Sequence, residues 1–170
     1  MRRVEHIMGL PVSIDIPAAP TKDSFVAAFK RLRQIDADYS PYKPESYVSK
    51  VQAGTLALRN LPAEQQTVLQ ACMHWNTQTG GYFNAYFSGI YDPSGYVKGW
   101  AIQQASDVLY AGGHDTFCIN AGGDVLLRSA NGHVWQIALQ HPRMPGLLWE
   151  QLPPATRQLL HLVRMRAVTT

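Results

Sequence analysis

Residues 92–100, with the sequence DPSGYVKGW, place an acid, a hydroxyl and a lysine in one glycine-containing stretch that leads into a predicted helix. Helix N-termini and lysine side chains both favour phosphate groups. Asp92 is suited to hydrogen-bond a nucleotide or to support a cation. The alternative is that Asp92 and Ser94 only cap the helix while Lys98 is solvated. The residue types favour neither interpretation over the other.

A second candidate is the sequence NAGGD at residues 120–124, directly after an apolar strand. Two successive glycines allow a sharp turn and leave backbone N–H groups uncovered by a Cβ. Such an arrangement can bind an anion. An ordinary β-turn is the simpler interpretation and is favoured on this motif alone. The motif is not a dinucleotide fingerprint, because no GxGxxG opens a helix here.

Aromatic and apolar residues beside glycines form a third group. The sequence YFN at residues 82–84 follows two glycines and offers a surface for a flavin or adenine ring, although burial in the core is the commoner outcome. Tyr42 lies between two prolines and is either a clamp on a ring or a surface loop residue. Met8, followed by Gly9 in the first predicted strand, marks either a close backbone approach to a ligand or a strand bulge.

The hydrophobic pattern predicts the elements that position these residues. Helices are expected from an N-cap at Thr21, over residues 46–51, from about residue 62 to the glycines at 80–81, and over 98–110. Their buried faces are predicted to be Phe25, Phe29, Leu32 and Ile35; Val68, Leu69, Cys72, Met73 and Trp75; and Ala101, Ala105, Val108 and Leu109.

Strands are predicted over residues 4–16 as one strand or a pair, over 116–119, and over 159–168. Residues 125–128 and 134–140 are predicted to form a hairpin around Asn131-Gly132, and residues 82–86 to be extended. Long helices followed by consecutive short strands indicate an α+β domain. Its helices should cover one face of a mainly antiparallel sheet.

Composition limits the classes of function. A chain of 170 residues that is 46% hydrophobic suits one compact domain. The net charge of +3 is scattered, and no Lys/Arg run with interleaved aromatics is present, so no nucleic-acid partner is predicted. A negatively charged small ligand fits this balance at least as well.

The cysteines and histidines do not predict a zinc site. The chain has no CxxC pair and no HExxH, and its six histidines are spread along the sequence. Cys72 and Cys118 are expected to be two buried thiols, with one disulfide as the less favoured alternative. No apolar run is long enough to span a bilayer. Residues 1–16 lack the apolar core of a signal peptide, so a cytoplasmic location is expected.

Five blocks, in order along the chain, resemble the ApbE family, the FAD:protein FMN transferases. The blocks are Met8-Gly9 with the following strand, residues 39–42 with Ser46, and residues 79–85, 91–105 and 118–125. Trp135 and Pro142 match the strand and turn that follow, so the resemblance runs from about residue 5 to 146. Ordered blocks over this length are more specific than any one motif.

The resemblance implies a T-fold-like α+β domain over residues 1–170, FAD as donor and Mg²⁺ as cofactor. It also implies a target flavoprotein whose Thr or Ser hydroxyl attacks the FMN phosphorus while AMP leaves. Carried over by position, the residues that contact FAD would be Met8, Tyr42, Tyr82, Phe83, Asn84, Asp92 and Lys98. The backbone carbonyl of Gly95 would be one Mg²⁺ ligand. No catalytic residue is assigned.

The chain departs from the family pattern in two ways. Asn84 stands where the family usually has Asp, and Gln103 where it has an acid. The family also continues past the strand represented by residues 159–170 into segments that supply side-chain metal ligands. The resemblance therefore implies a domain incomplete at its C-terminus, with an exposed sheet edge through which a homodimer could form. Two alternatives to a transferase stay open: a non-catalytic FAD- or nucleotide-binding remnant, and a scaffold that keeps only the fold.

Overall fold

The structure is a computed structural model that describes residues 1–170 except 18–21, 131, 141–147, 156, 162–164 and 169–170, and from residue 136 onward it describes the backbone. Thr21, Asn131 and Pro142, which the sequence singled out, lie outside the described residues. The helices are α1 (Lys22–Tyr39), α2 (Tyr47–Gln52), the 3₁₀ helix η1 (Leu58–Asn60), α3 (Ala63–Gln78) and α4 (Ser94–Ala111). The strands are β1 (Arg2–Ile7), β2 (Leu10–Asp15), β3 (Phe117–Ala121), β4 (Asp124–Arg128), β5 (Trp135–Gln140), β6 (Leu148–Ala155), β7 (Arg157–His161) and β8 (Met165–Val168).

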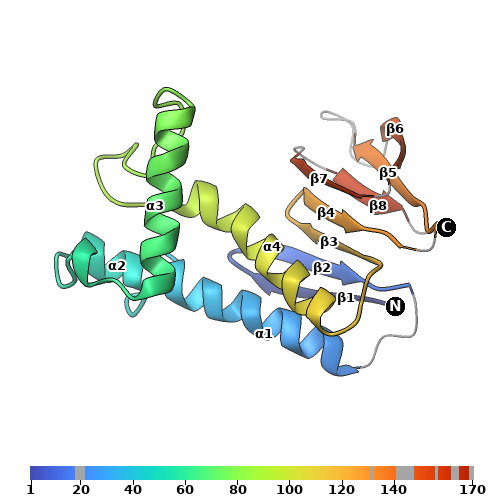
Figure 1. Cartoon of the computed structure of the whole chain (residues 1–170), viewed down its shortest axis with the longest axis horizontal. Coiled ribbons are helices and arrows are strands. Elements are labelled where there is room, and N and C mark those ends of the chain that lie inside the picture. The colour runs from blue at the N-terminus through green and yellow to red at the C-terminus, as the bar shows by residue number, and fades with distance from the viewer. Residues whose placement is uncertain (18–21, 131, 141–147, 156, 162–164, 169–170) are drawn as a thin grey trace. The chain divides into compact units, whose positions relative to one another are not determined.

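The chain divides into two compact units (Figure 1). The sheet unit comprises Met1–Leu32 and Ile102–Thr170, and the helical unit comprises Arg33–Ala101. Whether the two units form one domain, as the sequence predicts, stays a prediction. No helix in the described part of the chain is long and apolar enough to cross a membrane.

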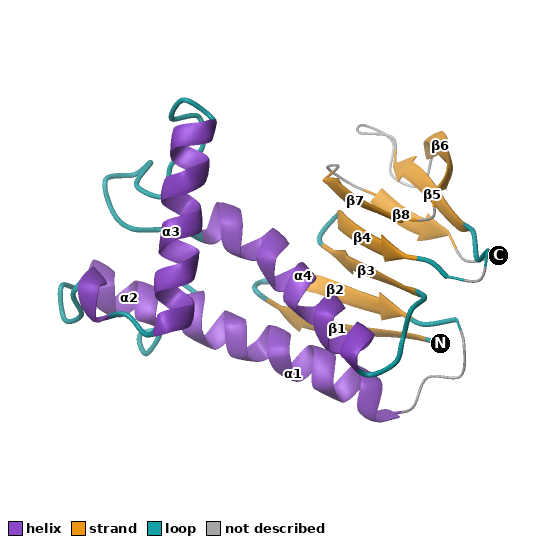
Figure 2. Ribbon diagram, in the orientation of Figure 1, coloured by secondary structure: helices purple, strands orange, loops and turns teal. Residues whose placement is uncertain are grey.

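The sheet unit is built on a five-stranded antiparallel sheet with the order β1-β2-β3-β4-β7. The parts of α1 and α4 in this unit lie against one face of the sheet (Figure 2), as the sequence predicted. The two helices are joined by a hydrogen bond of 2.8 Å from Arg31 Nη2 to Gln104 Oε1. The predicted core face of α1 is confirmed: Phe25, Phe29, Leu32 and Ile35 are all fully buried. On α4, Ala101, Ala105 and Leu109 are buried as predicted, and Val108 is half-buried.

The hairpin predicted between residues 125–128 and 134–140 is wrong. β4 pairs with β3 on one side and β7 on the other, whereas β5 pairs with β6 and β8 in a separate three-stranded sheet. β4 and β5 are therefore each hydrogen-bonded along both edges to other strands, and they do not pair with each other. The segment between β4 and β5 is closed by a side-chain bond in place of strand pairing, since Trp135 Nε1 donates to the Arg128 carbonyl over 3.0 Å. The single strand predicted over residues 159–168 is two strands, β7 and β8, which belong to different sheets.

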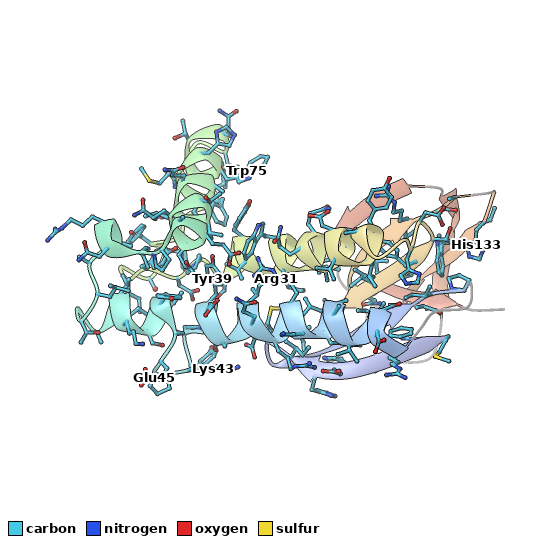
Figure 3. All side chains as sticks on the ribbon, turned by 60° about the horizontal axis from the view of Figure 1, so that its bottom comes forward. Arg31, Tyr39, Lys43, Glu45, Trp75 and His133 are labelled. Atoms are coloured by element: carbon cyan, nitrogen blue, oxygen red, sulfur yellow. The ribbon has the colours of Figure 1, made fainter. Side chains whose placement is uncertain are left out.

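In the helical unit, two boundaries and one face differ from the prediction. α4 begins at Ser94, a full turn before Lys98, and residues 82–86 form a bend followed by a turn in place of an extended segment. On α3, Val68 and Cys72 are buried, but Met73 and Trp75 are 61% and 47% exposed (Figure 3 labels Trp75). The polar side chain of Gln65 is buried on this helix. α3 thus buries a narrower apolar stripe than its sequence predicted.

Ring packing and free thiols complete the core. The rings of Tyr39 and Trp100 meet edge to face, with 5.4 Å between their centroids, so the last turn of α1 packs on α4 within the helical unit. Cys72 and Cys118 are both buried and free, which confirms the prediction of two thiols.

Candidate functional site

The start of α4 is built by Asp92. Its Oδ1 accepts a hydrogen bond of 2.9 Å from the Ser94 backbone N–H and a second from the Ser94 hydroxyl. The N–H groups of Tyr96 and Val97 both donate to the Pro93 carbonyl over 2.9 Å. Asp92 therefore does cap the helix, as the simpler interpretation held. Its Oδ2 lies outside these two bonds, so capping does not exclude contact with a ligand.

Gly95 brings an aromatic ring onto this helix start. A Cβ at residue 95 would lie 3.3 Å from Cε2 of Phe83, which is closer than ordinary carbon–carbon contact. The Phe83 ring therefore packs tightly against the backbone of residue 95, which has a conformation that any residue could adopt. Two segments that the sequence singled out separately, residues 82–84 and 92–98, meet at this contact.

The backbone of Phe83 is held by side chains from the last turns of α3. Asn76 Nδ2 donates to the Phe83 carbonyl over 2.7 Å, and the Phe83 N–H donates to Thr79 Oγ1 over 2.9 Å. The Thr79 hydroxyl in turn donates to the Trp75 carbonyl over 2.7 Å. Sequence reasoning missed Asn76 and named Thr79 only as the first residue of the family block at 79–85. The further signal was the position of two short polar side chains at the end of a predicted helix, just before the glycines.

Two backbone and side-chain bonds tie this loop to the segment before α4. The Asp92 N–H donates to the Ala85 carbonyl over 2.7 Å. From α2, Gln52 Nε2 donates to the Tyr91 carbonyl over 2.8 Å. The Asn84 Oδ1 accepts the Tyr86 N–H over 2.8 Å, which fixes a local turn. The structure therefore brings residues 82–84, 92 and 95 to one place in the helical unit.

Tyr82 and Tyr42 are the most accessible rings among the predicted contacts. Tyr82 is 99% exposed, so the expectation that core burial is the commoner outcome does not hold for it, while Phe83 is half-buried. Tyr42 is 92% exposed on the loop after α1, where its N–H donates to Ser40 Oγ over 3.3 Å. Lys98 lies one turn into α4, four residues after Ser94, and is half-buried. Residues four apart share a helix face, so Lys98 lies on the side of α4 that Ser94 begins.

Met8 lies in the sheet unit and is a turn residue, which corrects its prediction as part of a strand. With Gly9 it forms the two-residue connection between β1 and β2, and its φ of 56° is left-handed. This conformation costs a non-glycine residue roughly 1–2 kcal/mol. Among the described residues, Met8 is the non-glycine residue with a positive φ. Such an outlier motivates a search for function at this turn.

The turn of the NAGGD motif lies beside Met8 at the same end of the sheet. A Cβ at Gly122 would lie 3.2 Å from the Leu10 side chain, and the Gly122 N–H donates to the Pro11 carbonyl over 3.2 Å. Asn120 Oδ1 accepts the Gly123 N–H over 3.0 Å, which closes the turn. The two glycine-containing turns of the sheet unit therefore form one contiguous feature.

Burial keeps the groups around Tyr91 in their neutral forms. It raises the pKa of the Cys72 thiol to about 11. Burial first, then Cys72, Tyr86 and Asp92, raise the pKa of the Tyr91 hydroxyl. The rings of Tyr86 and Tyr91 are 5.6 Å apart between centroids. At neutral pH these groups are therefore protonated and uncharged, and none is poised to act as a base.

The described residues do not fit a complete Mg²⁺ site. No three His, Cys, Asp or Glu side chains among them gather closely enough to hold a metal ion. Mg²⁺ requires nearly octahedral oxygen coordination, usually with one or two carboxylates. At the start of α4, the oxygen atoms that could bind Mg²⁺ are those of the Asp92 carboxylate, which already accepts bonds from Ser94, and the Gly95 carbonyl. In the first turn of an α-helix that carbonyl accepts the N–H four residues further on, which leaves one lone pair.

Comparisons with known proteins agree on one family. The ApbE family profile matches residues 8–92 and 90–170. A single-residue variant of the flavin transferase ApbE from Vibrio cholerae is 17% identical, with a TM-score of 0.72, over 89% of this chain and 69% of that one. The ApbE protein from Thermotoga maritima is 12% identical, with a TM-score of 0.74, over 92% and 68% of the two chains. For the apo flavinyl transferase ApbE from Pseudomonas stutzeri the identity is 16%, the TM-score 0.66 and the coverage 82% and 64%.

At these identities the structural matches show a shared fold, and the chain spans about two thirds of the length of these relatives. The comparison with curated proteins gives no match. The α+β fold predicted from the sequence is confirmed.

Proposed function

Because the chain belongs to the ApbE family, we propose that it is a FAD:protein FMN transferase that moves FMN from FAD to a Thr or Ser hydroxyl of a target flavoprotein. The family match over residues 8–92 and 90–170 carries this proposal. The meeting of residues 82–84 with the start of α4 supports it, because an aromatic surface and a phosphate-attracting helix end are what a flavin nucleotide requires.

The aromatic part of the site would receive a ring of FAD. Tyr82 is almost fully exposed, so its ring is accessible to a ligand. Phe83 is half-buried and its backbone N–H and carbonyl are both bonded, so it would lose little backbone freedom on binding. Tyr42, in the same unit, adds an exposed ring to the proposed contacts. The contact of Met8 with FAD stays a prediction from the family resemblance. Asn84 would contribute an amide that is already oriented by its bond to the Tyr86 N–H.

The phosphates would lie at the first turns of α4, near Lys98. The positive end of the helix and the lysine both attract an anion. Asp92 opposes them, because its carboxylate lies at the same helix end and would repel a phosphate. A cation at this place would remove that repulsion, which makes Mg²⁺ dependence part of the proposal. Since the described residues do not complete a metal site, no step of the reaction is assigned to the ion.

The chemical step is a displacement at phosphorus. The acceptor hydroxyl oxygen forms a bond to the phosphorus of the FMN half, the bond from that phosphorus to the bridging oxygen breaks, and AMP leaves with that oxygen. The hydroxyl proton passes to solvent or to AMP. Fixed positive charge at the pyrophosphate lowers the barrier to such a step, and Lys98 with the α4 N-terminus is the candidate source.

A second candidate function is flavin-nucleotide binding without transfer. Two observations favour it: the described residues hold no cluster of metal-binding side chains, and neutral amides replace the family's acids at Asn84 and Gln103. Gln103 Nε2 donates to Asp107 Oδ1 over 2.8 Å, so the amide there is engaged with a carboxylate on its own helix. A scaffold without any ligand is the third alternative.

One experiment separates the three functions. The chain is first titrated with FAD and with FMN while flavin fluorescence is followed. It is then incubated with FAD, a flavoprotein acceptor and either Mg²⁺ or EDTA, and the acceptor is weighed by mass spectrometry. Acceptor flavinylation that EDTA abolishes supports the transferase. Tight FAD binding without any mass increase supports the binding function, and no binding of either flavin leaves the scaffold.

A further inference from the structure

The loop that carries Tyr82 and Phe83 is joined to α3 by an unusually complete set of contacts. Asn76 donates its side-chain amide to the Phe83 carbonyl over 2.7 Å. Its own carbonyl accepts the Gly81 N–H over 2.8 Å. A single residue of α3 thus binds the loop on both sides of Tyr82. The bond from the Phe83 N–H to Thr79 adds a third connection.

We propose that Asn76 is a positioning residue of the flavin site, which holds Phe83 so that its ring stays on the first turn of α4. This inference rests on the proposed function. The ring lies close enough to Gly95 that a Cβ there would displace it. The ring of Phe83 thus packs on α4 while its backbone is bonded to Asn76 and Thr79. Release of the carbonyl would let the loop swing about its two left-handed glycines, Gly80 and Gly81.

The type of side chain at residue 76 follows from the geometry. The group that faces the Phe83 carbonyl must donate a hydrogen bond, and the side chain must be short enough to reach back from the end of a helix. Asparagine satisfies both conditions. Aspartate has the same shape but offers only acceptors when ionised, so it would repel the carbonyl. Its negative charge would also be unfavourable at a helix C-terminus.

Three variants test the role of Asn76. Asn76→Ala removes the donor, Asn76→Asp keeps the shape but not the donor, and Thr77→Ala is the matched control. Thr77 follows Asn76 on the same turn and is exposed, and its hydroxyl donates to the Met73 carbonyl one turn earlier. Its backbone carbonyl accepts the Gly80 N–H, a bond that alanine keeps. A purely local weakening of the end of α3 would affect the control as well.

The first readout needs no flavin. Chymotrypsin cleaves after aromatic residues, and mass spectrometry identifies cleavage after Tyr82 and Phe83. With one partly buried hydrogen bond lost, we expect cleavage at these two bonds to be about tenfold faster in both Asn76 variants. The Thr77→Ala variant should be cleaved at the wild-type rate. Equal cleavage rates in Asn76→Ala and the control would overturn the inference, whatever the flavin measurements show.

The second readout separates positioning from general loosening. Affinities for FAD, FMN and AMP are measured for the same variants. We expect the affinity for FAD to fall about tenfold in both Asn76 variants. Of FMN and AMP, the two halves of FAD, only the one that contacts Phe83 should bind more weakly. An equal loss for FMN and AMP would mean that the whole unit has loosened, and would contradict the positioning role. If the wild-type chain binds none of the three, the proposed function fails, while the cleavage rates still decide whether Asn76 holds Phe83.

Discussion

Replacement of Gly95 by alanine tests whether the contact between Phe83 and α4 matters for ligand binding more than for stability. The added Cβ would lie 3.3 Å from the ring carbon, against an optimum of about 3.5–4.0 Å, so the ring must move by a few tenths of an ångström. Alanine gains about 0.5–1 kcal/mol over glycine in a helix. An off-rotamer adjustment of the ring costs about 0.5–1.5 kcal/mol. The two terms nearly cancel.

We therefore expect Gly95→Ala to change the free energy of unfolding by less than about 0.5 kcal/mol, which corresponds to about 2 °C in Tm for a chain of this size. Affinity for flavin should nevertheless fall about threefold to tenfold, because a displaced ring loses a stacking contact worth about 0.5–1.5 kcal/mol. Thermal unfolding and fluorescence titration measure the two effects on the same sample.

A double-mutant cycle with Phe83→Leu isolates the contact. In that background the clash is relieved, so Gly95→Ala should stabilise the protein by the full helix preference of about 0.5–1 kcal/mol. A loss of stability above about 1.5 kcal/mol in the wild-type background would show that Phe83 cannot yield. Unchanged flavin affinity in Gly95→Ala would refute the reasoning that the ring position serves the ligand.

Three further outcomes are expected. Gly122→Ala should destabilise the protein by about 1–3 kcal/mol, because residue 122 has a left-handed φ and the new Cβ would press on the Leu10 side chain. Gly132→Ala, where the new Cβ meets open space, should cost only about 1 kcal/mol for the left-handed backbone. Urea denaturation of both variants measures the difference. Lys98→Ala should weaken FAD binding about fivefold and Lys50→Ala, whose amine pairs with an exposed glutamate, should not; equal effects would mean that Lys98 is not a phosphate contact. Because burial raises the pKa of the Cys72 thiol to about 11, this thiol should react slowly with thiol reagents at pH 8. Burial of the neutral thiol should stabilise the protein fully below about pH 8.5, and this contribution should be lost as the pH rises toward 11. Chemical denaturation at a series of pH values measures it.

Local patterns predicted the elements with strong periodic signals. The four apolar residues at helical spacing in α1 are all fully buried, and the alternation in residues 4–16 corresponds to the hairpin of β1 and β2. In both cases the signal lies within one element or between two that are adjacent in sequence, and it does not depend on distant partners. These predictions were confirmed because the patterns behind them depend only on residues close together in sequence.

Pairing between distant strands could not be predicted from local signals. The sequence around Asn131-Gly132 is a strong hairpin signal, yet β4 pairs with β7 through a register that joins Asp124 to His161. β6 was missed because Pro153 and Pro154 argue against a strand. The wide apolar face predicted for α3 was wrong at Met73 and Trp75, because hydrophobic residues are not obliged to be buried.

The candidate site was predicted as separate motifs, and its assembly was not. Spacing along the chain gives no reason for Phe83 to contact Gly95, since that contact depends on the glycine turn after α3 and on the bond between Asp92 and Ala85. The family resemblance supplied the set of residues. The structure adds the local contacts of several of them, including the close approach of the Phe83 ring to Gly95.

Asn84 shows how a departure from the family pattern can leave the fold intact. Its Oδ1 accepts the Tyr86 N–H over 2.8 Å, and the carboxylate of an aspartate would accept the same bond. The turn therefore depends on an oxygen acceptor at residue 84 and not on its charge. What the amide removes is one negative charge from a site that already holds Asp92 at a helix end. Under the proposed function, less negative charge at the site would repel the FAD phosphates less and attract a metal cation less. Asparagine at residue 84 would then favour binding of the nucleotide over its cleavage.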